Sequence, residues 1–158
     1  MYRFILTVLI VTSLTSCGND CRQPDYPLSH NGNVTVAYNG IDFEAYLVCN
    51  SDEVSCTLLQ PDVLKGFTIE KRDDRILISK DSFELTYDTN TLDKLCPFIH
   101  LFDVFQMLNS QRYSFVDAGA FKISEFQING KNCKVTLEKE NNNFVQIDYD
   151  KFIFKFKA

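Results

Sequence analysis

Cysteine is the residue type with the most reactive side chains in this 158-residue chain, and it occurs six times. Thiols act as nucleophiles, bind zinc or pair as disulfides. A zinc site is not indicated, because no CxxC pair occurs and His30 and His100 lie outside any ligand-like spacing. A turn centred on residues 52–53 would place Cys49 opposite Cys56. That pairing allows a cross-strand disulfide, and the alternative is two buried free thiols on one face.

Cys17 differs from the other cysteines because an uncharged run, residues 4–16, precedes it. Arg3 supplies a positive charge before this run, an order typical of a secretory signal. The run is shorter than the roughly 20 apolar residues that span a bilayer. LTSC, residues 14–17, resembles the bacterial lipobox. The resemblance implies a signal peptide over residues 1–16, cleavage before Cys17, and diacylglycerol with palmitate-type chains on the Cys17 thiol.

The segment that follows, residues 17–32, is rich in Asn, Gly, Pro and Asp. Such a composition buries too little apolar surface to fold alone, so we interpret the segment as a lipidated tether. Two acyl chains are about what stable membrane attachment requires. We therefore expect the protein to contact the membrane through the lipid on Cys17, at the extracytoplasmic face of the cell membrane. Residues 33–158 have the length of one domain.

Composition and motifs exclude several functions. The net charge is −5, and removal of Arg3 with a signal peptide makes it more negative, which argues against a nucleic-acid partner. No GxSxG, HExxH or Gly-rich phosphate loop occurs. We expect no catalytic residue, no cofactor, no metal and a monomeric chain.

The pattern from residue 33 onward has a period of two, which is typical of half-buried strands. Asn39-Gly40 and Asn129-Gly130 are strong hairpin signals. Short connections require an antiparallel sheet, because parallel strands need long crossovers. The apolar phase changes between Ile123 and Phe126, which predicts a bulge near Ser124.

One segment breaks this period. Residues 98–108 are apolar at helical spacing, with His100, Asp103 and Gln106 on a narrow polar stripe, and Pro97 suits the first turn of a helix. An antiparallel meander of this length curls because strands twist. We therefore predict a mainly β (α+β) fold: an antiparallel incomplete half β-barrel of about ten to eleven strands, with the apolar helix covering its concave side.

This layout, with the motif PDVLKG at residues 61–66, resembles the LolA/LolB-like superfamily of bacterial envelope lipoprotein carriers. The resemblance implies an unclosed barrel with a helical lid over an apolar cavity that holds acyl chains. It also implies a lipid or lipoprotein as the ligand.

Two functions follow from this layout. The first is a membrane-anchored, non-catalytic envelope lipoprotein that binds a lipid or acyl chain between sheet and helix. The candidate lining residues are Phe43, Leu47, Phe67, Ile69, Ile76, Ile78, Phe83, Leu85, Phe98, Phe102 and Phe105. The alternative is a structural or protein-interaction lipoprotein in which the same side chains fill the core and no ligand binds.

Overall fold

The structure is a computed structural model that describes residues 24–25, 28–50, 54–72, 75–88 and 96–157. The predicted signal peptide, the lipidated Cys17 and the turn at residues 52–53 lie outside the described residues. The elements are, in chain order, β1 (His30–Tyr38), β2 (Ile41–Cys49), β3 (Val54–Gln60), the 3-10 turn η1 (Asp62–Leu64), β4 (Thr68–Arg72), β5 (Arg75–Lys80), β6 (Phe83–Asp88), α2 (Ile99–Ser110), β7 (Val116–Ala118), β8 (Phe121–Ile128), β9 (Lys131–Glu138), β10 (Phe144–Tyr149) and β11 (Phe152–Phe156).

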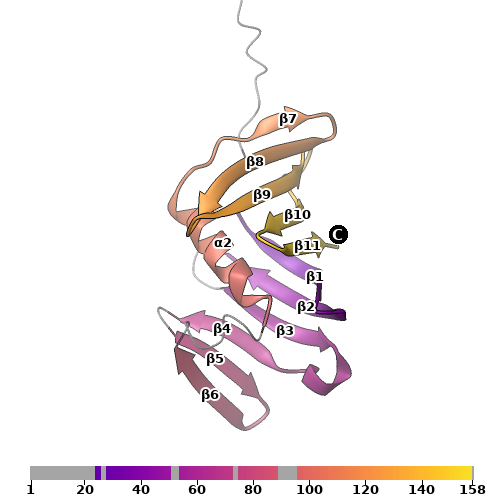
Figure 1. Ribbon diagram of the computed structural model, residues 1–158, viewed down its shortest axis with the longest axis vertical. Helices are drawn as coiled ribbons and strands as arrows, with labels where there is room; N and C mark the ends of the chain where they lie inside the picture. The colour runs from indigo at the N-terminus through magenta and orange to yellow at the C-terminus, as the bar shows by residue number, and fades with distance from the viewer. Residues whose placement is uncertain (1–23, 26–27, 51–53, 73–74, 89–95, 158) are drawn as a thin grey trace, which may run out of the picture.

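All strands belong to one eleven-stranded sheet in the order β6-β5-β4-β3-β2-β1-β11-β10-β9-β8-β7, and every pairing is antiparallel. The first and last strands, β1 and β11, pair in the middle and join two meanders. The sheet curves around α2, which connects one edge of the sheet to the other (Figure 1). This confirms the prediction of an open, mainly β half-barrel with one helix on its concave side.

The predicted Asn-Gly hairpins are present. Asn39 and Gly40 have φ angles of 52° and 76°, and Asn129 and Gly130 have φ angles of 51° and 75°. Two successive positive φ angles are what a type I′ turn requires, and Asn and Gly adopt them at low cost. The turns fix the registers of the β1–β2 and β8–β9 hairpins, and hence which face of each strand is buried.

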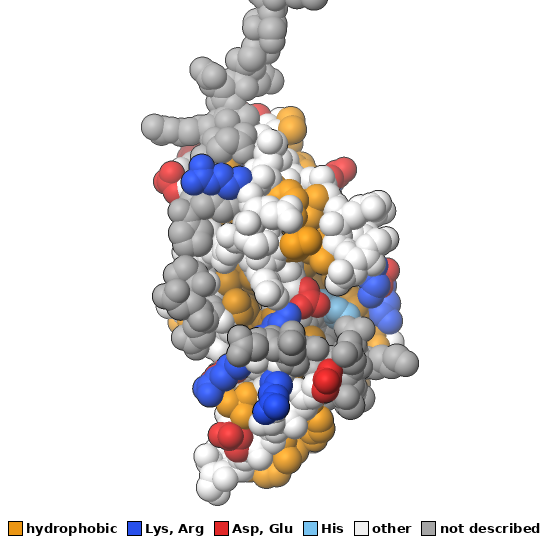
Figure 2. Space-filling model, turned by 90° about the vertical axis from the view of Figure 1, so that its left-hand side faces the viewer, with side chains coloured by type: hydrophobic (Ala, Val, Ile, Leu, Met, Phe, Trp, Pro, Cys, Tyr) orange, Lys and Arg blue, Asp and Glu red, His pale blue; other side chains and the backbone are white. Residues whose placement is uncertain are grey.

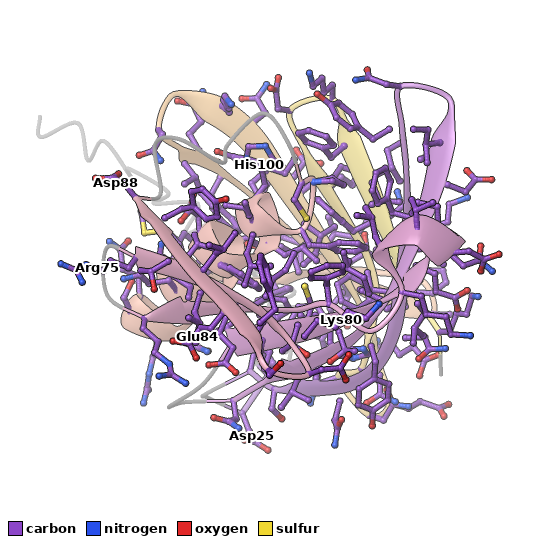
Figure 3. All side chains as sticks on the ribbon, turned by 90° about the horizontal axis from the view of Figure 1, so that it is seen from below. Asp25, Arg75, Lys80, Glu84, Asp88 and His100 are labelled. Atoms are coloured by element: carbon purple, nitrogen blue, oxygen red, sulfur yellow. The ribbon has the colours of Figure 1, made fainter. Side chains whose placement is uncertain are left out.

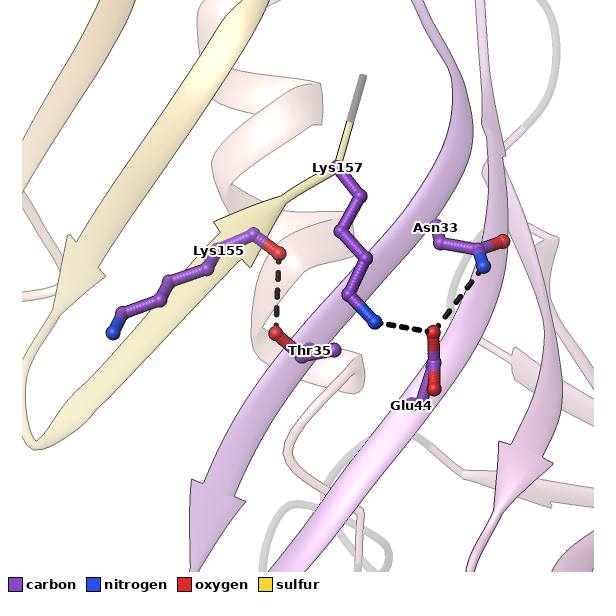
Figure 4. A network of polar contacts seen from close by, with 5 residues as sticks. All are labelled: Asn33, Thr35, Glu44, Lys155 and Lys157. Carbon is purple, nitrogen blue, oxygen red and sulfur yellow. Dashed lines mark hydrogen bonds and ion pairs between the residues drawn. The ribbon is translucent and has the colours of Figure 1, made fainter.

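Polar contacts on the outer face support the joint between the two meanders (Figure 4). The Thr35 hydroxyl donates to the backbone oxygen of Lys155, 3.5 Å away. The Glu44 carboxylate accepts from Lys157 Nζ at 2.8 Å and from Asn33 Nδ2 at 3.2 Å. These contacts tie β1 and β2 to the C-terminal end of the chain.

The folded domain begins earlier than residue 33. β1 starts at His30, so residues 30–32 of the predicted tether are already part of the sheet. Leu28 is buried, and its backbone N–H donates to Asn109 Oδ1 at 3.0 Å. The sequence boundary was placed too late because the alternating apolar pattern is visible only from Val34.

The predicted bulge near Ser124 is absent, and β8 pairs with β9 without interruption from Phe121 to Ile128. The change of apolar phase has another cause: Lys122 and Ser124 point inward and are buried, while Phe121 is 40% exposed. Lys122 Nζ donates to Asn142 Oδ1 at 2.8 Å, which partly satisfies the buried ammonium group.

Candidate functional site: a helix-filled sheet with an exposed edge

Helix α2 occupies the concave face of the sheet. Phe98, just before the helix, and Phe105 within it are fully buried. The Phe105 ring lies 5.0 Å from that of Phe144 at 73°, and the Phe98 ring lies 6.2 Å from that of Phe154. The other buried side chains of the helix are Ile99, His100, Leu101, Phe102, Val104 and Leu108. These contacts place apolar side chains of the helix directly against those of the sheet.

The predicted ligand-lining residues divide into three groups. Most are buried in the common core of sheet and helix: Phe43, Leu47, Ile69, Ile76, Phe98, Phe102 and Phe105. Phe67 and Ile78 are half-buried at the border of this core, while Phe83 and Leu85 are 48% and 39% exposed. The structure therefore does not gather these side chains around one space, and their role in binding a ligand stays a prediction.

The polar stripe of α2 makes specific contacts with the sheet. His100 is buried, and its ring lies 4.7 Å from that of Phe152. Asp103 Oδ1 accepts from Lys71 Nζ at 2.6 Å, and the same ammonium group donates to Gln106 Oε1 at 3.0 Å. The stripe thus fixes the helix to β4 and β11, and His100 is part of this packing.

Of the two alternatives for Cys49 and Cys56, the structure contains the free thiols and not the possible disulfide. The register explains why: Cys49 pairs with Val54, and Cys56 pairs with Leu47. The two cysteines are diagonal neighbours, and Cα atoms in that relation are about 7–8 Å apart. A disulfide normally requires about 4.4–6.8 Å. The expected register was wrong, while the alternative of buried thiols on one face agrees with the structure.

Burial makes the described thiols weak acids. Loss of hydration raises the pKa of Cys49 and of Cys133 to about 12 and that of Cys96 to about 11. The same cause, together with the neighbouring Cys96, raises the pKa of Cys56 well above its ordinary value. Since the thiolate is the nucleophile, these side chains are poor candidates for catalysis.

Sequence spacing argued against His30 as a zinc ligand but did not predict its surroundings. Its Nε2 is buried and has no hydrogen-bond partner among the described residues. Its ring stands edge-on to Phe156 at 4.8 Å and to Phe144 at 6.3 Å. Burial lowers the pKa of His30, and a hydrogen bond with the Gly32 backbone opposes this effect. These aromatic neighbours belong to β10 and β11, which are far from His30 in the sequence. No local sequence pattern therefore predicts the contact.

Open grooves occur on the outer faces and ends of the sheet. Three have volumes of about 470, 590 and 540 Å³. Most of the residues that line each groove are charged or polar, and no α2 residue lines any of the three. Phe43 alone among the predicted ligand-lining residues borders one of them. None of these three grooves therefore lies between the sheet and α2, where the predicted acyl-chain site would be.

Several large apolar side chains are exposed: Ile41, Tyr46, Val63, Phe83, Leu85, Val116, Phe121 and Ile153. Phe83 and Leu85 both belong to β6, at one end of the sheet. Figure 2 shows hydrophobic side chains between charged ones at the lower end of the molecule, which β4–β6 form in Figure 1. β6 thus carries two exposed apolar side chains at an edge of the sheet.

Within the described ranges, no group of three or more His, Cys, Asp or Glu side chains could hold a metal ion. No helix in the same part of the chain is long and apolar enough to cross a bilayer.

Comparison with solved structures identifies the class of fold. The chain is similar to the GerS lipoprotein in a structure of the CwlD amidase from Clostridioides difficile in complex with GerS. The TM-score is 0.51 at 18% identity, and the match covers 83% of this chain and 84% of GerS. The domain therefore has the fold of a known lipoprotein, an open antiparallel sheet with a helix on its concave side.

A LolA superfamily protein, NE2245 from Nitrosomonas europaea, matches with 9% identity over 77% of this chain and 63% of that protein. Its TM-score of 0.31 is too low to support an argument. No protein-family model matches the chain, and no curated protein matches it.

Proposed function

We propose that this protein is a non-catalytic lipoprotein that is anchored through Cys17 at the extracytoplasmic face of the cell membrane and holds a protein partner there. The observation that carries this proposal is the occupation of the concave face by α2. Phe98, Phe102 and Phe105 are fully buried where an acyl chain would otherwise lie. Close-packed interiors contain few voids larger than a water molecule, so interaction must use the outer surface.

The similarity to GerS supports a protein as the partner. GerS is present in its solved structure in complex with the CwlD amidase. An amidase at the cell surface is therefore the first partner class to test for this chain. The fold is compatible with such a role because it leaves both sheet edges and the outer face available within the described residues.

The position of the tether fits attachment to a membrane. Leu28, near the start of the described domain, is held against the C-terminal end of α2 by the hydrogen bond to Asn109. A fully extended chain rises about 3.3–3.6 Å per residue, so the segment 17–28 can span at most about 40 Å. An anchored domain would therefore stay within about one domain diameter of the bilayer surface.

Two measurements on the full chain test the proposal, the first in cells and the second after extraction from the membrane. Chemical cross-linking in cells followed by mass spectrometry should identify one dominant protein partner. Native mass spectrometry should show the lipid that is covalently attached and no additional stoichiometric lipid. A second, non-covalent lipid bound at one per chain would overturn the filled-core argument and favour a lipid carrier. Cross-linking with no protein captured would contradict the interaction role.

A further inference from the structure

The last strand of the sheet, β6, has an unpaired edge. β6 hydrogen-bonds to β5, and no other described strand lies beside it. All its residues are exposed except Tyr87, which is half-buried. A sheet edge presents a row of backbone N–H and C=O groups whose natural complement is another strand. The β6 edge is therefore a template for strand addition.

The two faces of β6 differ in chemistry. Phe83, Leu85 and Tyr87 share the concave face of the sheet, while Glu84 and Thr86 point to the outer face. The Phe83 ring stands perpendicular to Phe67 on the β4 side, with 6.3 Å between the ring centres. Leu85 pairs with Ile78 of β5. These side chains continue the apolar concave face beyond the area that α2 covers.

Within the described residues, the edge lacks several of the devices that usually prevent strand pairing. Proteins protect edges with proline, bulges, charges that point inward or charged side chains along the edge, and β6 carries the last of these at Glu84 and Asp88. β6 contains no proline, and it pairs with β5 in one continuous register from Arg75–Asp88 to Lys80–Phe83. Phe83 and Leu85 are exposed on its inward face. An edge of this kind can accept a partner strand.

Charge indicates which strand would fit. Glu84 pairs in register with Ser79, and its carboxylate makes no ion pair with any described residue. Asp88, by contrast, pairs in register with Arg75. Figure 3 views the molecule from this side, with these acidic residues on the strand nearest the viewer. A strand with a basic side chain beside Glu84 gains a favourable cross-strand pair.

We propose that the β6 edge binds an extended segment of the protein partner, which adds one further strand to the sheet. Apolar side chains of that segment cover Phe83 and Leu85, and a lysine or arginine of the segment lies beside Glu84. This inference rests on the proposed function, because it assigns the surface and the chemistry of the same partner. β-strand addition is an established mode of peptide recognition, with backbone bonds for affinity and side chains for specificity.

A second copy of this chain is a poorer occupant. Antiparallel pairing of two β6 strands with their concave faces on one side brings both Glu84 carboxylates onto the same outer face. Like charges across a strand pair are destabilising, and each chain already carries a net charge of −5. A lipid surface is also unsuitable, since it offers no ordered row of backbone donors and acceptors.

The test uses the full chain and an eight-residue peptide of alternating lysine and valine as the probe. Fluorescence anisotropy should detect binding, and hydrogen exchange should show new protection of β6 amides. Leu85→Lys and Glu84→Lys should each weaken binding at least about tenfold through charge repulsion. Ile153→Lys is the matched control, because Ile153 is 50% exposed on β11 and should leave binding unchanged. A glutamate–valine peptide should bind much more weakly.

The outcomes separate this inference from the proposed function. If the wild-type chain captures a protein in cells, and Leu85→Lys and Glu84→Lys leave that capture unchanged, the β6 site is overturned. The proposed interaction role would still stand. Wild-type chain that captures no protein would contradict the interaction role itself. If analytical ultracentrifugation detects a wild-type dimer that Leu85→Lys abolishes, the occupant of the β6 edge is a second copy of this chain. That result would overturn the choice of partner. Loss of capture in both variants, with unchanged melting temperatures, is the supporting result.

Discussion

At the scale of single residues, His30 couples stability to pH. Its Nε2 is buried without a hydrogen-bond partner among the described residues, and its ring packs against Phe144 and Phe156. Burial disfavours the charged imidazolium, so the pKa of His30 in the folded protein lies below the ordinary value of 6.5. The unfolded chain therefore binds this proton more readily than the folded chain does.

We expect stability to fall as the pH drops below about 6.5, and the contribution to be constant above that pH. His30→Phe fits the aromatic site and removes the titration, so the urea midpoint of this variant should change less between pH 7.5 and pH 5.5. His30→Gln removes the titration without adding apolar surface and serves as the control. Equal pH dependence in wild type and both variants would contradict this role for His30.

The four described thiols give a second prediction at the residue scale. In a variant in which Cys17 and Cys21 are replaced by serine, Cys49, Cys56, Cys96 and Cys133 remain. Their raised pKa values, and the burial of all but the half-buried Cys96, should prevent rapid reaction with a thiol reagent at pH 8 while the protein is folded. All four should react after unfolding in denaturant without a reductant.

This measurement also decides the question of the disulfide. A bond between Cys49 and Cys56 would leave only the other two thiols reactive after unfolding. Rapid reaction of the folded protein would instead show that the strands open easily. The sequence could not supply this register, because one residue more or less in a turn moves the pairing, and the chain alone does not fix that length.

At the scale of elements, helix α2 shows what the spacing of apolar residues can predict and what it cannot. The spacing of apolar residues predicted a helix over 98–108 that is buried on most sides, and α2 spans Ile99–Ser110. The pattern did not reveal that Asp103 and Gln106 both contact Lys71, because β4 is distant in sequence. Likewise, the phase change in β8 suggested a bulge, whereas Lys122 simply faces inward.

The filled concave face predicts a large effect for truncation of a helix side chain. Phe105 is fully buried between the rings of Phe144 and Phe156, so Phe105→Ala should lower the free energy of unfolding by about 3–5 kcal/mol. Ile153→Ala, at a half-exposed position of β11, should cost less than about 1 kcal/mol. Urea unfolding of the purified domain measures both changes.

A small cost for Phe105→Ala would have a clear meaning. It would indicate that the space under α2 is loosely packed and adapts to changes of volume. Such a core would favour the lipid-binding function over the interaction role. A loss of about 3–5 kcal/mol in the free energy of unfolding, together with a melting temperature that added phospholipid does not raise, would support the filled core.

At the scale of the whole molecule, the sequence predicted the class of fold but not the order of the strands. Alternating patterns and short turns identify neighbours along the chain, and each meander follows from them. The pairing of β1 with β11 joins residues at opposite ends of the sequence, such as Val34 and Phe156, and no local signal specifies it. Because of that pairing, β6 and β7 are the two edge strands of the sheet.

This arrangement also separates the proposed docking edge from the point where the tether meets the domain. Leu28 binds Asn109 at the end of α2 that leads toward β7. β6 and β7 lie at opposite ends of the long axis of the molecule (Figure 1). An anchored domain can therefore present the β6 edge to a partner without obstruction by its own attachment.

The anchor itself gives the prediction that belongs to this scale. Cys17→Ala should abolish incorporation of labelled palmitate and release the protein from the membrane fraction, because the thioether to diacylglycerol can form only on that thiol. Cys21→Ala is a close control, since it removes a neighbouring thiol in the same segment and should leave both labelling and membrane retention unchanged. Labelling that persists in Cys17→Ala would contradict the assignment of the lipid. Persistent membrane retention without labelling would show that the chain reaches the membrane through a protein partner, and the β6 variants Leu85→Lys and Glu84→Lys would then be expected to release it.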